Sequence, residues 1–183
     1  NGPESFTPDG NFILGESPEL KNFYVGAGFN AYGIAAGGGA GMALAEWVAN
    51  GRPPYDLWPV DIRRFGKPHQ DLEWVRKRTY EAYAKHYTMA WPFEENSSVR
   101  EFKKSPIYEK LKSSNACFGE KMGWERPNWF APKGSEPRDI YSFDRQNWFE
   151  FVGNEVKAAR ESAVLIDQTS FAKFIVSGKD SLQ

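Results

Sequence analysis

A predicted strand, a glycine turn and a glycine-rich helix follow one another over residues 23–50, and this arrangement constrains the fold more than any other feature. Residues 23–28 combine aromatic and β-branched side chains and end in glycine, which predicts a buried strand. A helix is predicted from about Gly33 to Asn50, with Gly51 as its C-terminal stop. The inner face of this helix is predicted to carry Met42, Leu44, Ala45 and Val48, which recur at helical spacing.

The first half of this helix is poor in helix-forming residues. Gly37, Gly38, Gly39 and Gly41 each cost about 1 kcal/mol relative to alanine. Close packing against a strand or a ligand is the usual compensation. The unpaired N–H groups of a helix start suit an anion or an electron-rich ring, such as the pyrimidine edge of a flavin. Tight packing on a sheet explains the same glycines, so the spacing alone leaves both interpretations open.

The remaining pattern predicts a mixed α+β fold. Short apolar or aromatic runs indicate strands, and helical spacing or a Ser-Pro start indicates helices. The predicted strands are 12–15, 163–166 and 171–176, and the predicted helices are 71–85, 105–113 and 154–162. In the helix 71–85, Leu72, Val75 and Ala82 are expected to share one side. In the helix 105–113, Ser105 is the expected cap. Residues 132–137 have the composition of a linker.

Composition excludes several classes of function. The aromatic content of 16% is sufficient for a packed core, and a net charge of −1 gives no general attraction to nucleic acid. No run approaches the roughly 20 apolar residues that cross a bilayer. Cys117 is the single cysteine and is expected to be a small buried hydrophobe. Because the sequence begins at Asn1 without methionine and ends at Leu182-Gln183, where a helix is expected to begin, we expect a fragment of a longer protein.

Other candidate sites are weak. His69 and His86 are expected to be exposed, with no third ligand patterned nearby, so no metal site is predicted. An aromatic cage for a methylated ammonium is conceivable, but packing is the favoured interpretation. Its members would be Trp124, Trp129, Trp148 and Phe149. Glu125 and Arg126 are expected to form a structural ion pair or a backbone contact. Four other charges are expected to be solvated in loops, namely Arg63, Arg64, Glu94 and Glu95.

Several segments in collinear order resemble one family. Residues 1–10 and 23–34 resemble the C-terminal end of the flavin domain of glycine-oxidase-like amine oxidoreductases. The segments Gly-Gly-Gly-Ala-Gly at 37–41, Asp-Ile-Arg-Arg-Phe at 61–65 and Gly-Trp-Glu-Arg-Pro-Asn-Trp-Phe at 123–130 narrow the resemblance. They are similar to the group of dimethylglycine dehydrogenase, sarcosine dehydrogenase and the pyruvate dehydrogenase phosphatase regulatory subunit.

This resemblance implies a layout and a chemistry. Residues 1–65 would be the C-terminal part of an FAD-dependent oxidoreductase domain, 66–141 a central connecting region, and 142–183 the start of an aminomethyltransferase-like folate-binding domain. In such proteins FAD takes a hydride from an N-methyl amine, and the one-carbon unit passes to tetrahydrofolate or is released as formaldehyde. Electron-transfer flavoprotein or oxygen would be the acceptor. The resemblance implies the mitochondrial matrix, or the cytoplasm of a bacterium.

The resemblance also implies a set of cofactor-binding residues. These are Gly28, Phe29, Asn30, Ala31, Tyr32, Gly33 and Ile34, which should line the isoalloxazine ring. Backbone N–H groups near Gly33 and Ile34 would face the pyrimidine edge, and Tyr32 and Asn30 would also be able to reach substrate. No catalytic residue is assigned. The alternative from the same family is a regulatory subunit of the phosphatase without catalytic turnover, and the residues that would decide lie outside this sequence.

Overall fold

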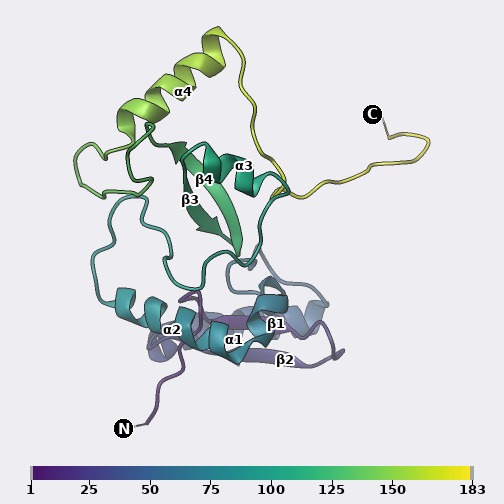
Figure 1. Ribbon diagram of the computed structural model, residues 1–183. Coiled ribbons are helices and arrows are strands. Elements are labelled where there is room, and N and C mark those ends of the chain that lie inside the picture. The colour runs from purple at the N-terminus through teal and green to yellow at the C-terminus, as the bar shows by residue number, and fades with distance from the viewer. Residues whose placement is uncertain (1, 182–183) are drawn as a thin grey trace. The chain divides into compact units, whose positions relative to one another are not determined.

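The computed structural model describes residues 2–181, which fold into two compact units (Figure 1). Unit 1 comprises residues up to Ala90 together with Ser97–Val99, and unit 2 comprises Trp91–Asn96 and the residues from Arg100 onward. Helices and strands occur in both units, which confirms the predicted mixed α+β class. The expected helix start at Leu182 lies outside the described residues.

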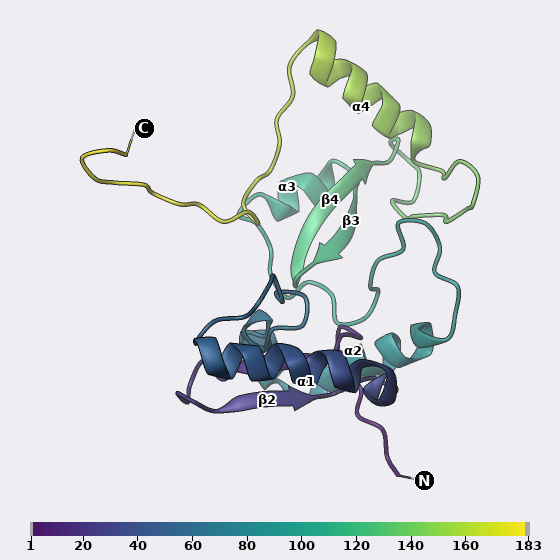
Figure 2. The ribbon, with the colours of Figure 1, turned by 180° about the vertical axis from the view of Figure 1, so that it is seen from behind.

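A two-stranded hairpin and one long helix form the centre of unit 1. Strands β1 (Ile13–Glu16) and β2 (Tyr24–Ala27) pair antiparallel, with Leu14 opposite Gly26. Helix α1 (Gly33–Asn50) packs along this hairpin, above β2 in the view of Figure 2. The predicted position of β2 is confirmed but its burial is not, because its first two residues are only partly buried and residues 26–27 are exposed.

Helix α1 has the predicted bounds but presents a different face to the core. Its end at Gly51 is confirmed, since Gly51 adopts φ 68° and donates its N–H to the carbonyl of Trp47. The buried residues are Ala40, Ala43 and Trp47, whereas Met42 and Val48 are each 56% exposed. Small residues let the helix backbone approach the hairpin closely, and this close approach selects the alanine face.

The second half of unit 1 consists of two 3-10 turns and a helix. The turns η1 (Ile62–Arg64) and η2 (Lys67–Gln70) precede helix α2 (Leu72–His86), which Asp71 caps by accepting from the N–H groups of Glu73 and Trp74. The expected inner face of α2 is wrong at Leu72, which is 83% exposed. Arg78 is buried instead, and one of its guanidinium nitrogens donates to the carbonyl of Ser98 at 2.7 Å.

Of the arginine pair at the first turn, Arg63 is exposed as expected, with 52% of its side chain accessible, whereas Arg64 is not. Arg63 forms a bidentate contact with the buried Asp61, with Nε 3.0 Å from each carboxylate oxygen. The side chain of Arg64 is only 6% exposed and binds Asp9 through Nε at 2.5 Å. Arg64 therefore ties the segment around η1 to the loop before β1, whereas the contact of Arg63 lies within that segment.

Unit 2 is built on a second hairpin. Strands β3 (Ala116–Lys121) and β4 (Trp124–Phe130) pair antiparallel, with helix α3 (Tyr108–Ser113) before them and helix α4 (Phe149–Glu161) after them. Helix α3 begins at Tyr108, so Ser105 is not its cap, although the carbonyl of Ser105 accepts from the N–H of Tyr108. Helix α4 begins five residues earlier than the predicted 154.

The core of unit 2 explains the tryptophans of this region. Trp129, Cys117 and Ala131 are buried, with Trp148, Phe151 and Val152 packed against them. Trp129 stacks on Phe151 at 5.7 Å between ring centroids. The packing interpretation is therefore confirmed for Trp129 and Trp148.

Glu125 forms an ion pair and a backbone contact, the latter by accepting from the N–H of Glu101 at 2.7 Å, but its ionic partner is not its neighbour in sequence. The buried Glu125 binds Arg100 at 2.5 Å rather than Arg126, whose guanidinium lies 4.8 Å from the ring centre of Phe171. Glu95, expected in solvent, accepts from the backbone N–H of Glu120 at 2.9 Å. Neighbours in sequence point to opposite faces of a strand, so Glu125 and Arg126 cannot easily meet.

The two strands expected at 163–166 and 171–176 are not formed within residues 2–181. These residues are largely exposed, with Leu165 at 93% and Ile175 at 96%. A strand requires a partner for its backbone groups, and the described part of the chain offers none here. In the same part of the chain no helix has the length and apolarity needed to cross a membrane.

Candidate functional site

The loop between β2 and α1 contains five of the seven residues that the sequence predicts at the cofactor, Gly28 to Tyr32, and the other two, Gly33 and Ile34, begin α1. The first residue of the loop, Gly28, adopts φ +62°, and a Cβ there would lie 2.7 Å from the side chain of Thr7. Both the backbone conformation and the available space therefore require glycine at this position. The turn redirects the chain from the hairpin into α1.

Asn30 holds this loop from the inside. It is 1% exposed, and its Oδ1 accepts from the N–H of Thr7 at 2.9 Å, while its Nδ2 donates to the carbonyl of Gly28 at 2.7 Å. Its own N–H donates to the carbonyl of Ser5. The structure thus places the Asn30 side chain within the loop, away from the surface where a substrate would lie.

The other loop residues form the outer part of the turn. Phe29 stacks on Phe12 at 5.1 Å, and Ala31 adopts φ 67°. Tyr32 precedes the first helical residue and is 52% exposed, and its ring lies 5.1 Å from that of His86. Ile34 is completely exposed. The end of the loop at Tyr32 and the start of α1 at Gly33 and Ile34 therefore lie at the surface of unit 1.

The first turn of α1 can receive a negatively charged group. No side chain caps this helix, and its first turn contains no acidic residue. The first N–H groups of a helix have no partner within the helix and carry partial positive charge. A Cβ built on any of Gly37, Gly38, Gly39 or Gly41 meets nothing within 4 Å. The backbone at this end of α1 is thus open to a negatively charged group.

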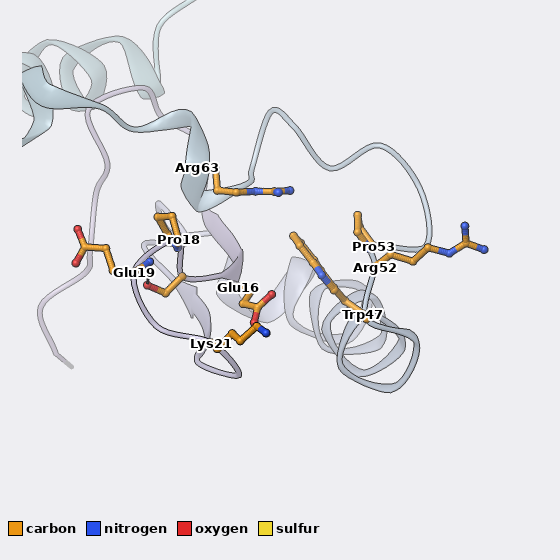
Figure 3. Close-up of a pocket in the computed structure, with 10 residues that line it drawn as sticks. Glu16, Pro18, Glu19, Lys21, Trp47, Arg52, Pro53 and Arg63 are labelled. Carbon is orange, nitrogen blue, oxygen red and sulfur yellow. Dashed lines mark hydrogen bonds between the residues drawn. The ribbon is translucent and has the colours of Figure 1, made fainter. Parts of the chain in front are cut away.

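A separate cavity of about 630 Å³ lies at the other end of α1 (Figure 3). Its lining includes Glu16, Lys21, Trp47, Arg52 and Arg63, which come from three separate stretches of the sequence. The guanidinium of Arg63 lies 5.6 Å from the centre of the Trp47 ring, whereas that of Arg52 points away from the other labelled side chains. This cavity was not predicted from the sequence, because no single motif contains its residues.

Beside this cavity, Asp61 and Arg63 form an ion pair with each other. Burial opposes ionisation of Asp61, but hydrogen bonds from Arg63 outweigh it and lower the pKa of this carboxyl group. The pKa of Arg63 is raised by the same contact. Arg63 is therefore engaged with Asp61 and adds little free positive charge to the cavity.

The histidines and the cysteine do not form a second reactive site. His69 and His86 are half-buried rather than exposed as predicted, because each packs against aromatic rings. Burial and the neighbouring Asp139 raise the pKa of Cys117 to about 12, so its thiol is unreactive. Among residues 2–181 no group of three or more His, Cys, Asp or Glu side chains could hold a metal ion.

Two family models match the chain in sequence. Residues 50–105 match the FAD dependent oxidoreductase central domain, and residues 107–183 match the GCVT N-terminal domain. The fold and the two matches thus define a class of protein in which these two domains are joined. The two family models meet at residues 105–107, whereas the sequence predicts domain boundaries at 65/66 and 141/142.

Individual relatives match over the whole chain. The whole of this chain is 45% identical to 4-methylaminobutanoate oxidase (formaldehyde-forming) of Paenarthrobacter nicotinovorans. Over 98% of this chain it is 37% identical to human mitochondrial sarcosine dehydrogenase, and over 100% it is 36% identical to mouse mitochondrial dimethylglycine dehydrogenase. The chain spans only about a fifth of each relative, namely 22%, 22% and 21%. The chain belongs to the family of dimethylglycine dehydrogenase, sarcosine dehydrogenase and the pyruvate dehydrogenase phosphatase regulatory subunit, as the resemblance predicted.

Proposed function

We propose that the protein containing this chain is an FAD-dependent dehydrogenase or oxidase that removes N-methyl groups from a small amine. The observation that carries this proposal is collinear identity of 34–45% over essentially the whole chain with proteins of that activity. The uncapped start of α1 supports it, since the geometry there suits the cofactor that the family uses.

The residues of this chain would act through their backbone. A bound flavin would accept the hydride that leaves the N-methyl carbon. The N–H groups of Gly33, Ile34 and Ala35 would then offset negative charge at the pyrimidine edge, because the start of α1 is uncapped. Gly28 and Asn30 would hold the loop in shape, and Tyr32 would border the space above it.

The substrate is proposed to be an N-methylated amino acid. The names of the three relatives denote substrates with an N-methyl amine, and we propose dimethylglycine, sarcosine and 4-methylaminobutanoate as the compounds to compare. Identity is higher with the 4-methylaminobutanoate oxidase, at 45%, than with the sarcosine and dimethylglycine dehydrogenases, at 37% and 36%. This difference makes 4-methylaminobutanoate as strong a candidate as dimethylglycine.

The later part of the chain is proposed to begin a folate-binding domain. The match of residues 107–183 to the GCVT N-terminal domain supports transfer of the one-carbon unit to tetrahydrofolate. We keep the division into 1–65, 66–141 and 142–183 as a proposal. Electron-transfer flavoprotein or oxygen is the proposed acceptor. The proposed location is the mitochondrial matrix, as the names of the mammalian relatives suggest, or the cytoplasm for a bacterial source.

A second candidate function has its own support. The chain is also 36% identical, over its full length, to the mouse pyruvate dehydrogenase phosphatase regulatory subunit. A protein of that kind would bind the phosphatase and would not oxidise an amine.

The visible absorption spectrum of the full-length protein would separate the two functions. We expect a flavin band that bleaches when dimethylglycine, sarcosine or 4-methylaminobutanoate is added without oxygen. The amine that bleaches it fastest identifies the substrate. A flavin band that none of these amines bleaches would refute the substrate class. A protein without flavin that co-purifies with a phosphatase would establish the regulatory function instead.

A further inference from the structure

His86 joins the end of α2 to the start of α1 through a cluster of aromatic rings. It is the last residue of α2, and its ring centre lies 5.1 Å from that of Tyr32 and 5.4 Å from that of Phe6. Tyr87 makes an edge contact with it at 4.5 Å, and Phe6 also contacts Tyr83 at 4.9 Å. Rings from three separate parts of unit 1 thus surround one imidazole.

The loop that this cluster borders needs anchoring. Asn30 and Ala31 are consecutive non-glycine residues with φ of 48° and 67°, a conformation that side chains disfavour. Such strain persists only where the surroundings hold it. The hydrogen bonds of Asn30 to Thr7 and Gly28 hold the first half of the loop. They do not reach Tyr32, at the exit of the loop.

Tyr32 is the residue through which an anchor at the exit would act. Its N–H donates to the carbonyl of Phe29 at 2.8 Å, and its carbonyl accepts from the N–H of Ala36 at 2.8 Å. It therefore belongs both to the turn and to the first hydrogen bond of α1. A shift of its backbone would move the N–H groups of the residues that follow it, and a packed ring restrains such a shift.

We propose that His86 is a positioning residue, whose imidazole ring holds Tyr32 and thereby fixes the start of α1 for the reaction. This inference rests on the proposed function, which assigns that backbone to the flavin. Displacing a reacting or binding group by 1 Å costs up to about 100-fold in rate, so the anchor affects catalysis without touching the substrate. The ring, rather than its charge, is the feature that makes the contact with Tyr32.

The test compares three variants of the full-length protein. His86→Ala removes the ring, His86→Phe keeps an aromatic ring, and His69→Ala removes a half-buried imidazole that contacts Phe65 and Trp74 instead. Hydrogen exchange of the Tyr32 and Ala36 amides reports the anchor directly. The limiting rate of flavin reduction by saturating amine, measured separately from the KM, reports its consequence.

We expect His86→Ala to speed exchange of both amides about tenfold and to slow flavin reduction about tenfold, with flavin content unchanged. His86→Phe should restore most of both values, and His69→Ala should change neither. Unchanged exchange in His86→Ala, an unchanged reduction rate, or equal effects in His69→Ala would each overturn the proposal. A wild-type protein without a bleachable flavin would refute the proposed function, while the exchange data would still decide whether His86 holds Tyr32.

Discussion

Two asparagines of unit 1 adopt the same unusual backbone conformation but differ in what their side chains do. Asn22 and Asn30 have φ of 60° and 48°. Asn22 is exposed, whereas Asn30 is 1% exposed and hydrogen-bonded to both Thr7 and Gly28. Substitution at Asn22 therefore measures the free-energy cost of a positive φ without asparagine. Substitution at Asn30 measures that cost together with the loss of the hydrogen bonds of its side chain.

We expect Asn30→Ala to lower the free energy of unfolding by about 2 kcal/mol more than Asn22→Ala, because it leaves two buried backbone groups unpaired. Urea denaturation of the full-length protein measures both variants. Equal losses would show that the side chain of Asn30 contributes only its tolerance of positive φ.

Glu81 should make the stability of unit 1 depend on pH. Burial raises the pKa of this carboxyl group, but hydrogen bonds from Ser98, Ser97 and Lys85 outweigh it and lower the pKa from 4.5 to about 2. A carboxyl group with a lowered pKa in the folded state stabilises that state above its unfolded pKa. This stabilisation is lost as the pH falls toward the folded value.

We therefore expect thermal stability to fall between about pH 5 and pH 2, and to fall less steeply in Glu81→Gln over the same window. Calorimetric melts at several pH values make the comparison. Parallel pH profiles for the two proteins would remove Glu81 as the cause.

Cys117 should be inert in the folded protein. With its pKa raised to about 12 by burial and by Asp139, roughly one thiol in ten thousand is ionised at pH 8. We expect iodoacetamide to leave the peptide containing Cys117 unmodified in the native state and to modify it fully in guanidinium, as mass spectrometry would show. Rapid native labelling would mean that the core around Trp129 opens readily.

At the scale of elements, the glycines of α1 and α4 offer a matched comparison. Gly38 and Gly153 are both helical, and a Cβ on either meets nothing within 4 Å. Helix propensity alone predicts a gain of about 1 kcal/mol for alanine at each position. The proposed flavin, however, would lie against the start of α1 and not against α4.

We expect Gly153→Ala to stabilise the full-length protein by about 1 kcal/mol, and Gly38→Ala to give a smaller gain or a loss of bound flavin. Melting temperature and flavin absorbance provide the two measurements. An equal gain at both positions would show that the glycine face of α1 is open in the whole protein.

The elements differ in how much of them the sequence could predict. The bounds of α1 follow from local signals, since glycine stops the helix at Gly51 whatever packs beside it. Its buried face does not follow, because it depends on the hairpin that Ala40, Ala43 and Trp47 contact. The strands expected at 163–166 and 171–176 are a similar case, since their side chains are typical of strands but pairing depends on another segment.

The candidate site shows the same division. The glycine turn and the helix start were predictable from residues 23–50. The resemblance to the family implied that a flavin binds there. The burial of Asn30 by Thr7 and the contact of Tyr32 with His86 were not, because each joins segments distant in sequence. The cavity lined by Trp47 and Arg63 was missed for the same reason.

At the scale of the whole molecule, the chain passes between its two compact units three times. It leaves unit 1 after Ala90, returns for Ser97–Val99 and leaves again at Arg100. Ser97 and Ser98 are held there by Glu81, which accepts from both backbone N–H groups, at 2.7 and 2.9 Å.

This short return has a consequence for how the protein comes apart. A protease that cuts once between Ala90 and Ser97 breaks the covalent chain, yet the second fragment still carries Ser97 and Ser98, which Glu81 of the first fragment binds. The nicked protein should therefore migrate as one species on a native gel and as two only in detergent. Glu81→Ala keeps the hydrogen bond of Arg78 to the carbonyl of Ser98, so the same single cut should release more of the fragments than in the unchanged protein.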